Sequence, residues 1–399
     1  MIIVVSFFAD LEGCCPAEWL DDKIHALEAL NKKYLLVCGA GNGEKYGRKC
    51  IQVPSLSFND WKTDLKEMKR LGKRIKPQYY LMLPFVITFG LLWDLIYGIS
   101  GGRTSWFFMV FPVLCYLLLT RKIDSLFATG GPYSAALATS MSGKIFRKNV
   151  VVEFQDPIVS SSFNGVKYKI ACLIEKIIVF CSDSIVFVTK KACVLSRSRN
   201  LSCQNKIKQI YPGAWNLHIS SFEEKNEVKV IRVVHLGTLY GDRHIDALIT
   251  AVDEINKEKS CMQFEVINVG AIYNDKLKEY CSKDFFKLEK ATNRVNALKF
   301  AAQCDIMILA QHESLVSYET IPYKFYDYLN LNKPIIALRI NKEIDTFLAD
   351  DKGVAVLPQD VGNIKKYLLN FLVGKSKSNH MYNQYNRQFI RNVEALFEV

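Results

Sequence analysis

The segment from Glu319 to Leu338 carries the side chains best suited to chemistry. Two carboxylates, Glu319 and Asp327, are separated by seven residues, and Lys324 lies between them. Pro322 predicts a helix start here, because proline is favoured in the first helical turn. Lys324 and the amides of that turn would then hold a diphosphate at the positive end of the helix, and Asp327 would accept hydrogen bonds from a ribose diol. A capped helix with a solvated charged face is the alternative.

Further polar loops follow apolar runs elsewhere in the chain. In residues 234–243, a predicted strand leads into a glycine loop that ends at Arg243. A guanidinium suits a diphosphate because it offers paired donors and stays charged, although an exposed helix-start arginine is the alternative. Residues 129–134, Thr-Gly-Gly-Pro-Tyr-Ser, form a small-residue loop between a strand and a helix. Asp156, followed by Pro157, would orient a hydroxyl of donor or acceptor, or else simply begin a turn.

Four isolated residues carry weaker signals. Gly13 follows the first apolar run and would let the backbone approach a ligand closely. His235 lies inside a predicted strand, where packing explains it. His244 and His312 lie in or beside predicted loops from which they would reach a substrate.

Taken in chain order, these segments resemble the retaining, nucleotide-sugar-dependent glycosyltransferases of family four, which have the GT-B fold. That family carries a Glu-x7-Glu motif, written in one branch as Pro-x-Lys-x-x-Glu-Tyr followed by Lys-Pro and an apolar strand. Glu319 matches the first acid, Lys324 the lysine, and Asp327 the second acid with one methylene fewer. The resemblance implies that Glu319 is catalytic beside the donor sugar, Lys324 binds the phosphates and Asp327 binds the ribose.

The resemblance also implies roles for the other loops. Asp156 would be a second catalytic residue. The donor would be bound by Gly237, Arg243, Pro322 and Tyr323, and the acceptor-side loops would contain Gly13, Gly130, Gly131 and Ser134. The implied reaction transfers a glycosyl unit, of hexosyl or N-acetylhexosaminyl type, to a hydroxyl with retention. No cofactor or metal is expected, since the sequence has no Asp-x-Asp triplet.

Short unbroken apolar runs alternate with helical patterns along the chain, which predicts parallel sheets covered on both faces. The predicted strands are residues 1–8, 34–38, 125–129, 149–154 and 184–188, and then 228–236, 264–270, 305–310, 334–338 and 353–357. We therefore expect an α/β protein with two doubly wound, Rossmann-like domains facing each other across a cleft, with ligands at the carboxyl ends of the strands.

A proline- and glycine-containing stretch without periodicity divides the two series of strands. It predicts an acceptor-side domain over residues 1–211, a linker over 212–226 and a donor-side domain over 227–380. The last segment, 381–399, has apolar residues on one stripe and is expected to form a helix that crosses back to the first domain.

Composition limits the class of protein. The 399 residues are half apolar and 23% charged, which is typical of folded domains. Twelve cysteines without a Cys-x-x-C pair, only six histidines and no secretory leader argue against a disulfide scaffold or a zinc site and favour the cytoplasm. The net charge of +12 predicts an anionic partner. We expect no nucleic acid, because the basic residues are dispersed.

Two apolar stretches interrupt the first domain. Residues 79–97 contain a single charge and residues 106–119 contain none, and lysines and arginines flank both. Core helices, a surface that enters the headgroup region of a bilayer and a transmembrane hairpin all fit this pattern. The basic flanks favour peripheral attachment to the anionic inner face of the cell membrane. We therefore expect a polyprenyl-diphosphate-linked saccharide acceptor, in bacterial O-antigen or capsule synthesis.

Three other functions remain open. A sugar-nucleotide epimerase shares this architecture and would need no acceptor. A noncatalytic binding protein of the same fold is compatible with the Glu-to-Asp departure at Asp327. A nucleic-acid binder would explain the net charge, but no block of interleaved aromatic and basic residues is present.

Overall fold

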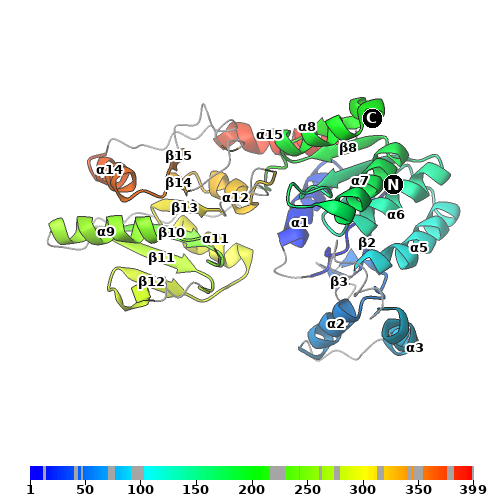
Figure 1. Ribbon diagram of the computed structural model, residues 1–399, viewed down its shortest axis with the longest axis horizontal. Coiled ribbons are helices and arrows are strands. Elements are labelled where there is room, and N and C mark those ends of the chain that lie inside the picture. Colours follow the sequence, from blue (N-terminus) through cyan, green and yellow to red (C-terminus); the bar gives the residue numbers. More distant parts are fainter. Residues whose placement is uncertain are drawn as a thin grey trace. The chain divides into compact units, whose positions relative to one another are not determined.

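The chain folds into two units, each built on its own parallel sheet (Figure 1). Unit 1 comprises Met1–Trp215 with Phe389–Val399, and unit 2 comprises Asn216–Gln388. The boundary lies inside the linker predicted over 212–226. The structure is a computed structural model that describes residues 1–11, 15–39, 44–45, 48–70, 77–90, 103–215, 230–241, 243–259, 263–273, 279–311, 319–338, 344, 354–374 and 382–397.

The sheet of unit 1 is parallel throughout, in the order β5-β2-β1-β6-β7-β8-β9. Its central strands are apolar on both faces, because helices cover both. A short antiparallel pair, β3 (Glu44–Lys45) and β4 (Arg48–Lys49), lies outside it. The seven strands are β1 (Ile2–Val5), β2 (Tyr34–Cys38), β5 (Ile51–Gln52), β6 (Ser125–Thr129), β7 (Asn149–Phe154), β8 (Ser184–Phe187) and β9 (Ile207–Gln209).

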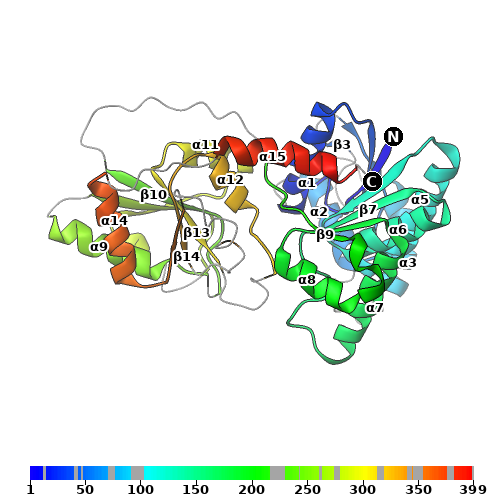
Figure 2. The same cartoon turned by 90° about the horizontal axis from the view of Figure 1, so that it is seen from above.

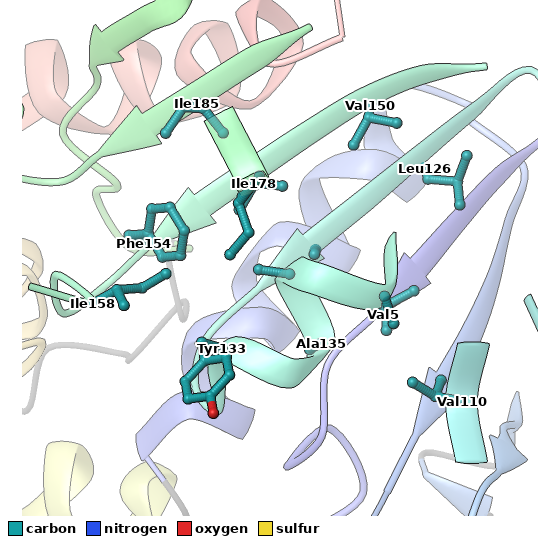
Figure 3. Packing of buried hydrophobic residues seen from close by; sticks show 14 of the residues in the cluster. Val5, Val110, Leu126, Tyr133, Ala135, Val150, Phe154, Ile158, Ile178 and Ile185 are labelled. Atoms are coloured by element: carbon teal, nitrogen blue, oxygen red, sulfur yellow. The ribbon is translucent and has the colours of Figure 1, made fainter. Parts of the chain in front are cut away.

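Helices cover the two faces of this sheet in two groups. On one face, α6 packs between α5 and α7, and Figure 3 shows Val5, Leu126 and Val150 of adjacent strands beside Ala135 of α6 and Ile178 of α7. The other face packs against α1 and the end of α15. The helices of unit 1 are α1 (Cys15–Ala29), α2 (Phe58–Arg70), α3 (Pro77–Phe85), α5 (Trp106–Thr120), α6 (Tyr133–Ile145), α7 (Gly165–Cys181) and α8 (Lys190–Arg199). Helix α15 (Tyr382–Ala395) begins in unit 2, and its residues from Phe389 onward belong to unit 1.

The last helix confirms one prediction about the chain's end. Phe389, Val393 and Leu396 are buried with Leu20 and Ile24 of α1 in the core of unit 1. The C-terminal segment therefore returns to the first unit.

The sheet of unit 2 is also parallel, in the order β12-β11-β10-β13-β14-β15. Helices α9 and α14 pack side by side against one face (Figure 2). The apolar residues Leu248, Ile249, Val252 and Ile255 recur at helical spacing on α9 and are fully buried. The strands are β10 (Ile231–Leu236), β11 (Phe264–Val269), β12 (Phe286–Glu289), β13 (Ile306–Ala310), β14 (Ile335–Leu338) and β15 (Val354–Leu357); the helices are α9 (Asp246–Glu258), α11 (Arg294–Ala302), α12 (Lys324–Asn330) and α14 (Val361–Leu372).

Both sheets contain a topological switch point. The strand order runs outward in opposite directions from the first strand of each unit, so the switch lies between β1 and β6 in unit 1 and between β10 and β13 in unit 2. Ligands of open parallel sheets bind beyond the carboxyl ends of the strands at such points. A ligand of unit 2 is therefore expected at the carboxyl ends of β10 and β13.

The apolar stretch over 106–119 forms α5, which is both core and surface. Trp106, Val110 and Leu114 are fully buried, whereas Tyr116 and Leu119 on the other side are 64% and 73% exposed. Within the described residues, one helical segment, Arg103–Thr120, is long and apolar enough to cross a bilayer, and a third of it is buried. The first stretch, 79–97, is described only to residue 90, as part of α3 and a π-helical turn at Val86–Gly90.

Candidate functional site

Two glycines shape the carboxyl edge of the sheet in unit 2. Gly237 follows β10 with φ +108°, and Gly270 follows β11 with φ +140°, conformations that favour glycine. A Cβ atom on Gly270 would lie 2.6 Å from the carbonyl oxygen of Gly237. The two loops therefore pass so closely that no side chain fits between them, and the predicted loop glycine, Gly237, has a backbone that demands glycine.

Lys324 brings a positive charge to this edge. It is the first residue of α12, and its Nζ donates to Nε2 of His235 at 2.9 Å and to the carbonyl oxygen of Leu236 at 3.1 Å. One turn later, the hydroxyl of Tyr328 accepts a hydrogen bond from the Leu236 amide at 3.0 Å. Because two residues of α12 bind the end of β10, the ammonium is fixed beside Gly237, at the switch point.

A chain of buried polar groups fixes the orientation of that lysine. An ammonium only donates, so Nε2 of His235 must accept and the ring proton lies on Nδ1. Nδ1 then donates to Oδ1 of Asn268 at 2.7 Å, and Nδ2 of Asn268 donates to the Gly270 carbonyl oxygen at 2.9 Å. Burial and the charges of Lys324 and Arg243 lower the pKa of His235 well below its usual value. The imidazole is therefore neutral, as its role of acceptor requires.

Arg243 supplies a second cation in the same electrostatic environment. Its guanidinium carbon lies 5.1 Å from the centre of the Tyr240 ring, and its charge is among the causes that lower the pKa of His235. Nε of Arg243 is buried and has no hydrogen-bond partner among the described residues. Lys324 and Arg243, both predicted for the diphosphate, thus act on the same neutral imidazole, and their charges favour an anion at this strand end.

Asp327 lies in a buried ion pair that the sequence did not predict. Nη2 of Arg294 lies 2.6 Å from Oδ1 of Asp327, and Nε lies 3.2 and 3.3 Å from the two carboxylate oxygens. The same guanidinium carbon is 4.8 Å from the centre of the Tyr323 ring. Burial raises the pKa of Asp327, and Arg294 opposes this rise. Asp327, which was predicted to bind the ribose, is therefore held by Arg294 at the start of α11.

The remaining predicted donor-side residues lie on the segment that leads into α12. The side chain of Glu319 is buried, with 1% exposed, and Tyr323 is 5% exposed. The carbonyl oxygen of Pro322 accepts from the Phe325 amide at 3.0 Å, which begins the helical turn. The catalytic role of Glu319 stays a prediction. His312 lies outside the described residues.

In unit 1, the predicted acceptor-side loop begins where β6 ends. Gly130 has φ +78°, and Gly131 precedes Pro132. Ser134 is fully buried, and its hydroxyl donates to the carbonyl oxygen of Arg103 at 2.9 Å. It anchors the start of α6, and its acceptor-side role stays a prediction. Gly13 lies outside the described residues.

Asp156 follows β7 at the same edge of the sheet. Its side chain is exposed, yet neighbouring protein atoms displace enough water to raise its pKa. It therefore lies at the strand end where it was predicted, and its catalytic role stays a prediction.

A second buried ion pair lies under this edge. Nζ of Lys23 on α1 is 2.8 Å from Oε1 of Glu153 on β7, and both side chains are almost fully buried. The hydroxyl of Thr129, the register partner of Glu153, donates to the same oxygen at 2.9 Å. Burial lowers the pKa of Lys23, and Glu153 opposes this fall. The pair ties α1 to the two strands that flank the Gly130 loop.

Over the described ranges, no group of three His, Cys, Asp or Glu side chains is arranged to hold a metal ion. The expectation that no metal is needed stays a prediction.

No protein-family model matches the sequence, and no curated protein matches it at a significant level. Solved structures do match over nearly the whole chain. Anabaena HepE, in complex with UDP and glucose, superposes with a TM-score of 0.61 at 11% identity, covering 99% of each chain. The sucrose-phosphate synthase of Thermosynechococcus elongatus gives 0.58 at 12% identity, covering 99% of this chain and 94% of its own.

A third match has another activity in its name. The UDP-GlcNAc 2-epimerase of Neisseria meningitidis, bound to UDP-GlcNAc, gives a TM-score of 0.51 at 12% identity over 100% of both chains. Identities this low establish a common fold and leave the activity open. Two parallel-sheet Rossmann-like units, matched over their full length by these proteins, show that the chain has the GT-B fold.

Proposed function

We propose that the protein is a glycosyltransferase that moves a sugar from a nucleotide diphosphate sugar to a hydroxyl of a saccharide acceptor. The observation that carries this proposal is the ammonium of Lys324, which His235 and Leu236 hold at the switch point of unit 2. The charge of Arg243 also acts on His235, so it adds to the positive charge there. The neighbours of known structure that hold UDP or a UDP-sugar support the choice of ligand class.

The cations would act on the leaving group. Breaking the bond between sugar and diphosphate builds negative charge on the departing phosphate. Fixed positive groups that face this charge stabilise the transition state without reorganising. Lys324 is suited to this because the neutral imidazole and a backbone carbonyl hold its ammonium in place. Glu319, buried on the adjoining segment, would lie beside the donor sugar, and Asp327 would contact the ribose through whichever lone pairs Arg294 leaves available.

Unit 1 would bind the acceptor. We propose a lipid-diphosphate-linked saccharide as acceptor, with the protein attached peripherally to the inner face of the membrane. The exposed side of α5, which carries no charge between Arg103 and Arg121, supports attachment to a bilayer. Synthesis of a bacterial surface polysaccharide would use such an acceptor.

Two measurements test the proposal. The purified protein is first screened for thermal stabilisation by uridine, guanosine and thymidine diphosphate sugars, since a ligand that binds only the folded state raises the midpoint. The stabilising donor is then incubated with lipid-linked acceptors, and the glycosylated lipid is detected by mass spectrometry. Failure of every activated sugar to stabilise the protein would refute a nucleotide-sugar function.

An epimerase is the second candidate, favoured by the match to UDP-GlcNAc 2-epimerase over the whole chain. It would convert the stabilising nucleotide sugar into its epimer without any acceptor. Proton NMR of the donor incubated with enzyme alone separates the two, because a transferase leaves the donor's configuration unchanged. Stabilisation with neither reaction would indicate a noncatalytic binding protein.

A further inference from the structure

A cavity of about 570 Å³ opens on unit 1 at the end of the sheet opposite to the Gly130 loop. It lies where α6 and α7 end and β7 begins, so it is distinct from the strand ends where the acceptor loop lies. Its lining consists of Gly143, Lys144, Arg147, Lys148, Asn149, Cys181 and Asp183. We call it the basic pocket.

The lining of the basic pocket has an excess of positive charge. Outside the lining, Asp124 also interacts with Lys148: the amino terminus and, to a lesser extent, Lys148 lower the pKa of Asp124. Lys144, Arg147 and Lys148 form no ion pair with any residue that the structure describes. The single acidic residue of the lining, Asp183, accepts a hydrogen bond from the Val150 amide at 2.9 Å. Three cations and one backbone-bound carboxylate leave the pocket positive, and this favours an anionic occupant.

A favourable interaction with the end of helix α6 explains only one of these three cations. Lys144 lies in the last turn of α6, where a cation complements the helix dipole. Arg147 and Lys148 lie beyond the helix, in a turn that Arg147 enters with φ +51°. The turn therefore presents two further cations at the cavity.

Apolar side chains adjoin the pocket. Ile145 and Phe180 are 60% and 63% exposed, although both are large and apolar. The Lys144 ammonium lies 5.4 Å from the centre of the Phe180 ring. Exposed apolar side chains directly beside lysines are typical of surfaces that enter the boundary between lipid headgroups and acyl chains.

The apolar surface continues along α7. Val166, Leu173 and Phe180 recur at helical spacing on its exposed side, and Lys169 and Lys176 are exposed between them. Helix α7 packs on the same face of the sheet as α5, with α6 between them. The exposed sides of α5 and α7 thus belong to one face of unit 1.

We propose that the basic pocket binds the phosphate of an anionic phospholipid headgroup while Ile145 and Phe180 enter the adjoining acyl region. The inference deepens the membrane attachment that forms part of the proposed function. The apolar neighbours favour a lipid over free phosphate, because a soluble anion would gain nothing from them. Lys144, Arg147 and Lys148 would donate to the phosphate oxygens, and the exposed side of α7 would lie along the membrane surface.

Vesicle sedimentation of the whole 399-residue chain tests this. Phosphatidylcholine vesicles with and without phosphatidylglycerol are compared for the wild type and for Arg147→Gln/Lys148→Gln. From the usual contribution of a basic residue near an anionic surface, the double variant should bind anionic vesicles about 30-fold more weakly. Lys32→Gln/Lys33→Gln is the matched control, because these exposed lysines also lie in a helix-to-strand turn at this edge, on the far side of β1 and β6. It should change binding by less than about threefold.

Two further experiments test whether the pocket binds a phospholipid or free phosphate. Ile145→Ser/Phe180→Ser should also weaken vesicle binding, and inorganic phosphate should not displace the wild type at concentrations matched to the lipid phosphate. Unchanged vesicle binding by either pocket or apolar variant, or displacement by inorganic phosphate, would overturn the inference. Nucleotide-sugar binding and thermal unfolding are measured on the same variants. If a variant loses vesicle binding but keeps its nucleotide-sugar binding and melting temperature, the loss is due to the basic pocket and not to unfolding or to the donor site. If the wild type binds no nucleotide sugar, the proposed function is refuted, and the vesicle result still tests the pocket.

Discussion

Replacing Arg294 with methionine would test the electrostatics beside the predicted ribose ligand. The change removes the guanidinium that contacts both oxygens of Asp327 and leaves that carboxylate 6% exposed without its cation. Removing one member of a buried ion pair usually costs about 3–5 kcal/mol, because the other charge stays buried. For a unit of this size the loss corresponds to a fall in melting temperature of about 6–20 °C.

The loss should depend on pH in a defined direction. Burial already raises the pKa of Asp327 above 3.8, and Arg294 opposes that rise. A carboxyl group with a raised pKa in the folded state binds its proton more tightly there, so it destabilises the fold above that pKa and the penalty vanishes in acid. Without Arg294 the pKa rises further. The difference in unfolding free energy between the wild type and Arg294→Met should therefore shrink as the pH falls toward 3.8.

Urea unfolding of both proteins at several pH values measures this difference. Arg294→Met/Asp327→Leu is the control, because replacing both charges with apolar groups should restore most of the stability. A loss below about 1 kcal/mol, a loss that grows in acid, or a double variant as unstable as the single would each refute the reasoning.

Three further predictions concern other buried groups. Lys23→Met should destabilise unit 1 by about 3–5 kcal/mol, and Lys23→Met/Glu153→Leu should recover most of it in the same urea assay; equal losses would contradict the buried pair. His235→Leu removes the acceptor that orients the α12 lysine and should weaken nucleotide-sugar binding about tenfold by calorimetry, whereas His25→Leu, at a half-buried histidine of α1 in unit 1, should leave it unchanged; equal affinities would exclude a positioning role. Gly270→Ala should lower the melting temperature by several degrees, from about 1–3 kcal/mol of backbone strain, and an unchanged midpoint would mean that the two loops are farther apart.

The central strands were predictable because both of their faces are buried. Residues 125–129 and 149–154 form unbroken apolar runs and fold as β6 and β7 with the predicted bounds. Strand β12 was missed because it lies at the edge of its sheet, and three of its four residues are exposed. Strand β9, with one exposed lysine among three residues, was missed for the same reason.

The candidate site was predictable at Lys324 and its neighbours, where the spacing lies within one short segment. Its partners were not, since His235 is 89 positions away and Arg294 is 33 positions from Asp327. One signal was present in the sequence. His235 and Asn268 are polar residues at the ends of otherwise apolar strands, and each precedes a glycine by two positions. The two residues lie opposite each other in the sheet. Paired polar residues of this kind indicate a buried hydrogen bond at the switch point.

Titration calorimetry of UDP into the wild type, Lys324→Met and Lys299→Met tests the central claim most directly. Lys299 is an exposed lysine of α11, so Lys299→Met is the control that removes the same charge elsewhere in unit 2. We predict that Lys324→Met weakens UDP binding by about tenfold to a hundredfold, as expected for a charge-assisted hydrogen bond to phosphate, while Lys299→Met binds like the wild type. Equal affinities for all three proteins would show that the ammonium at the end of β10 does not hold a diphosphate.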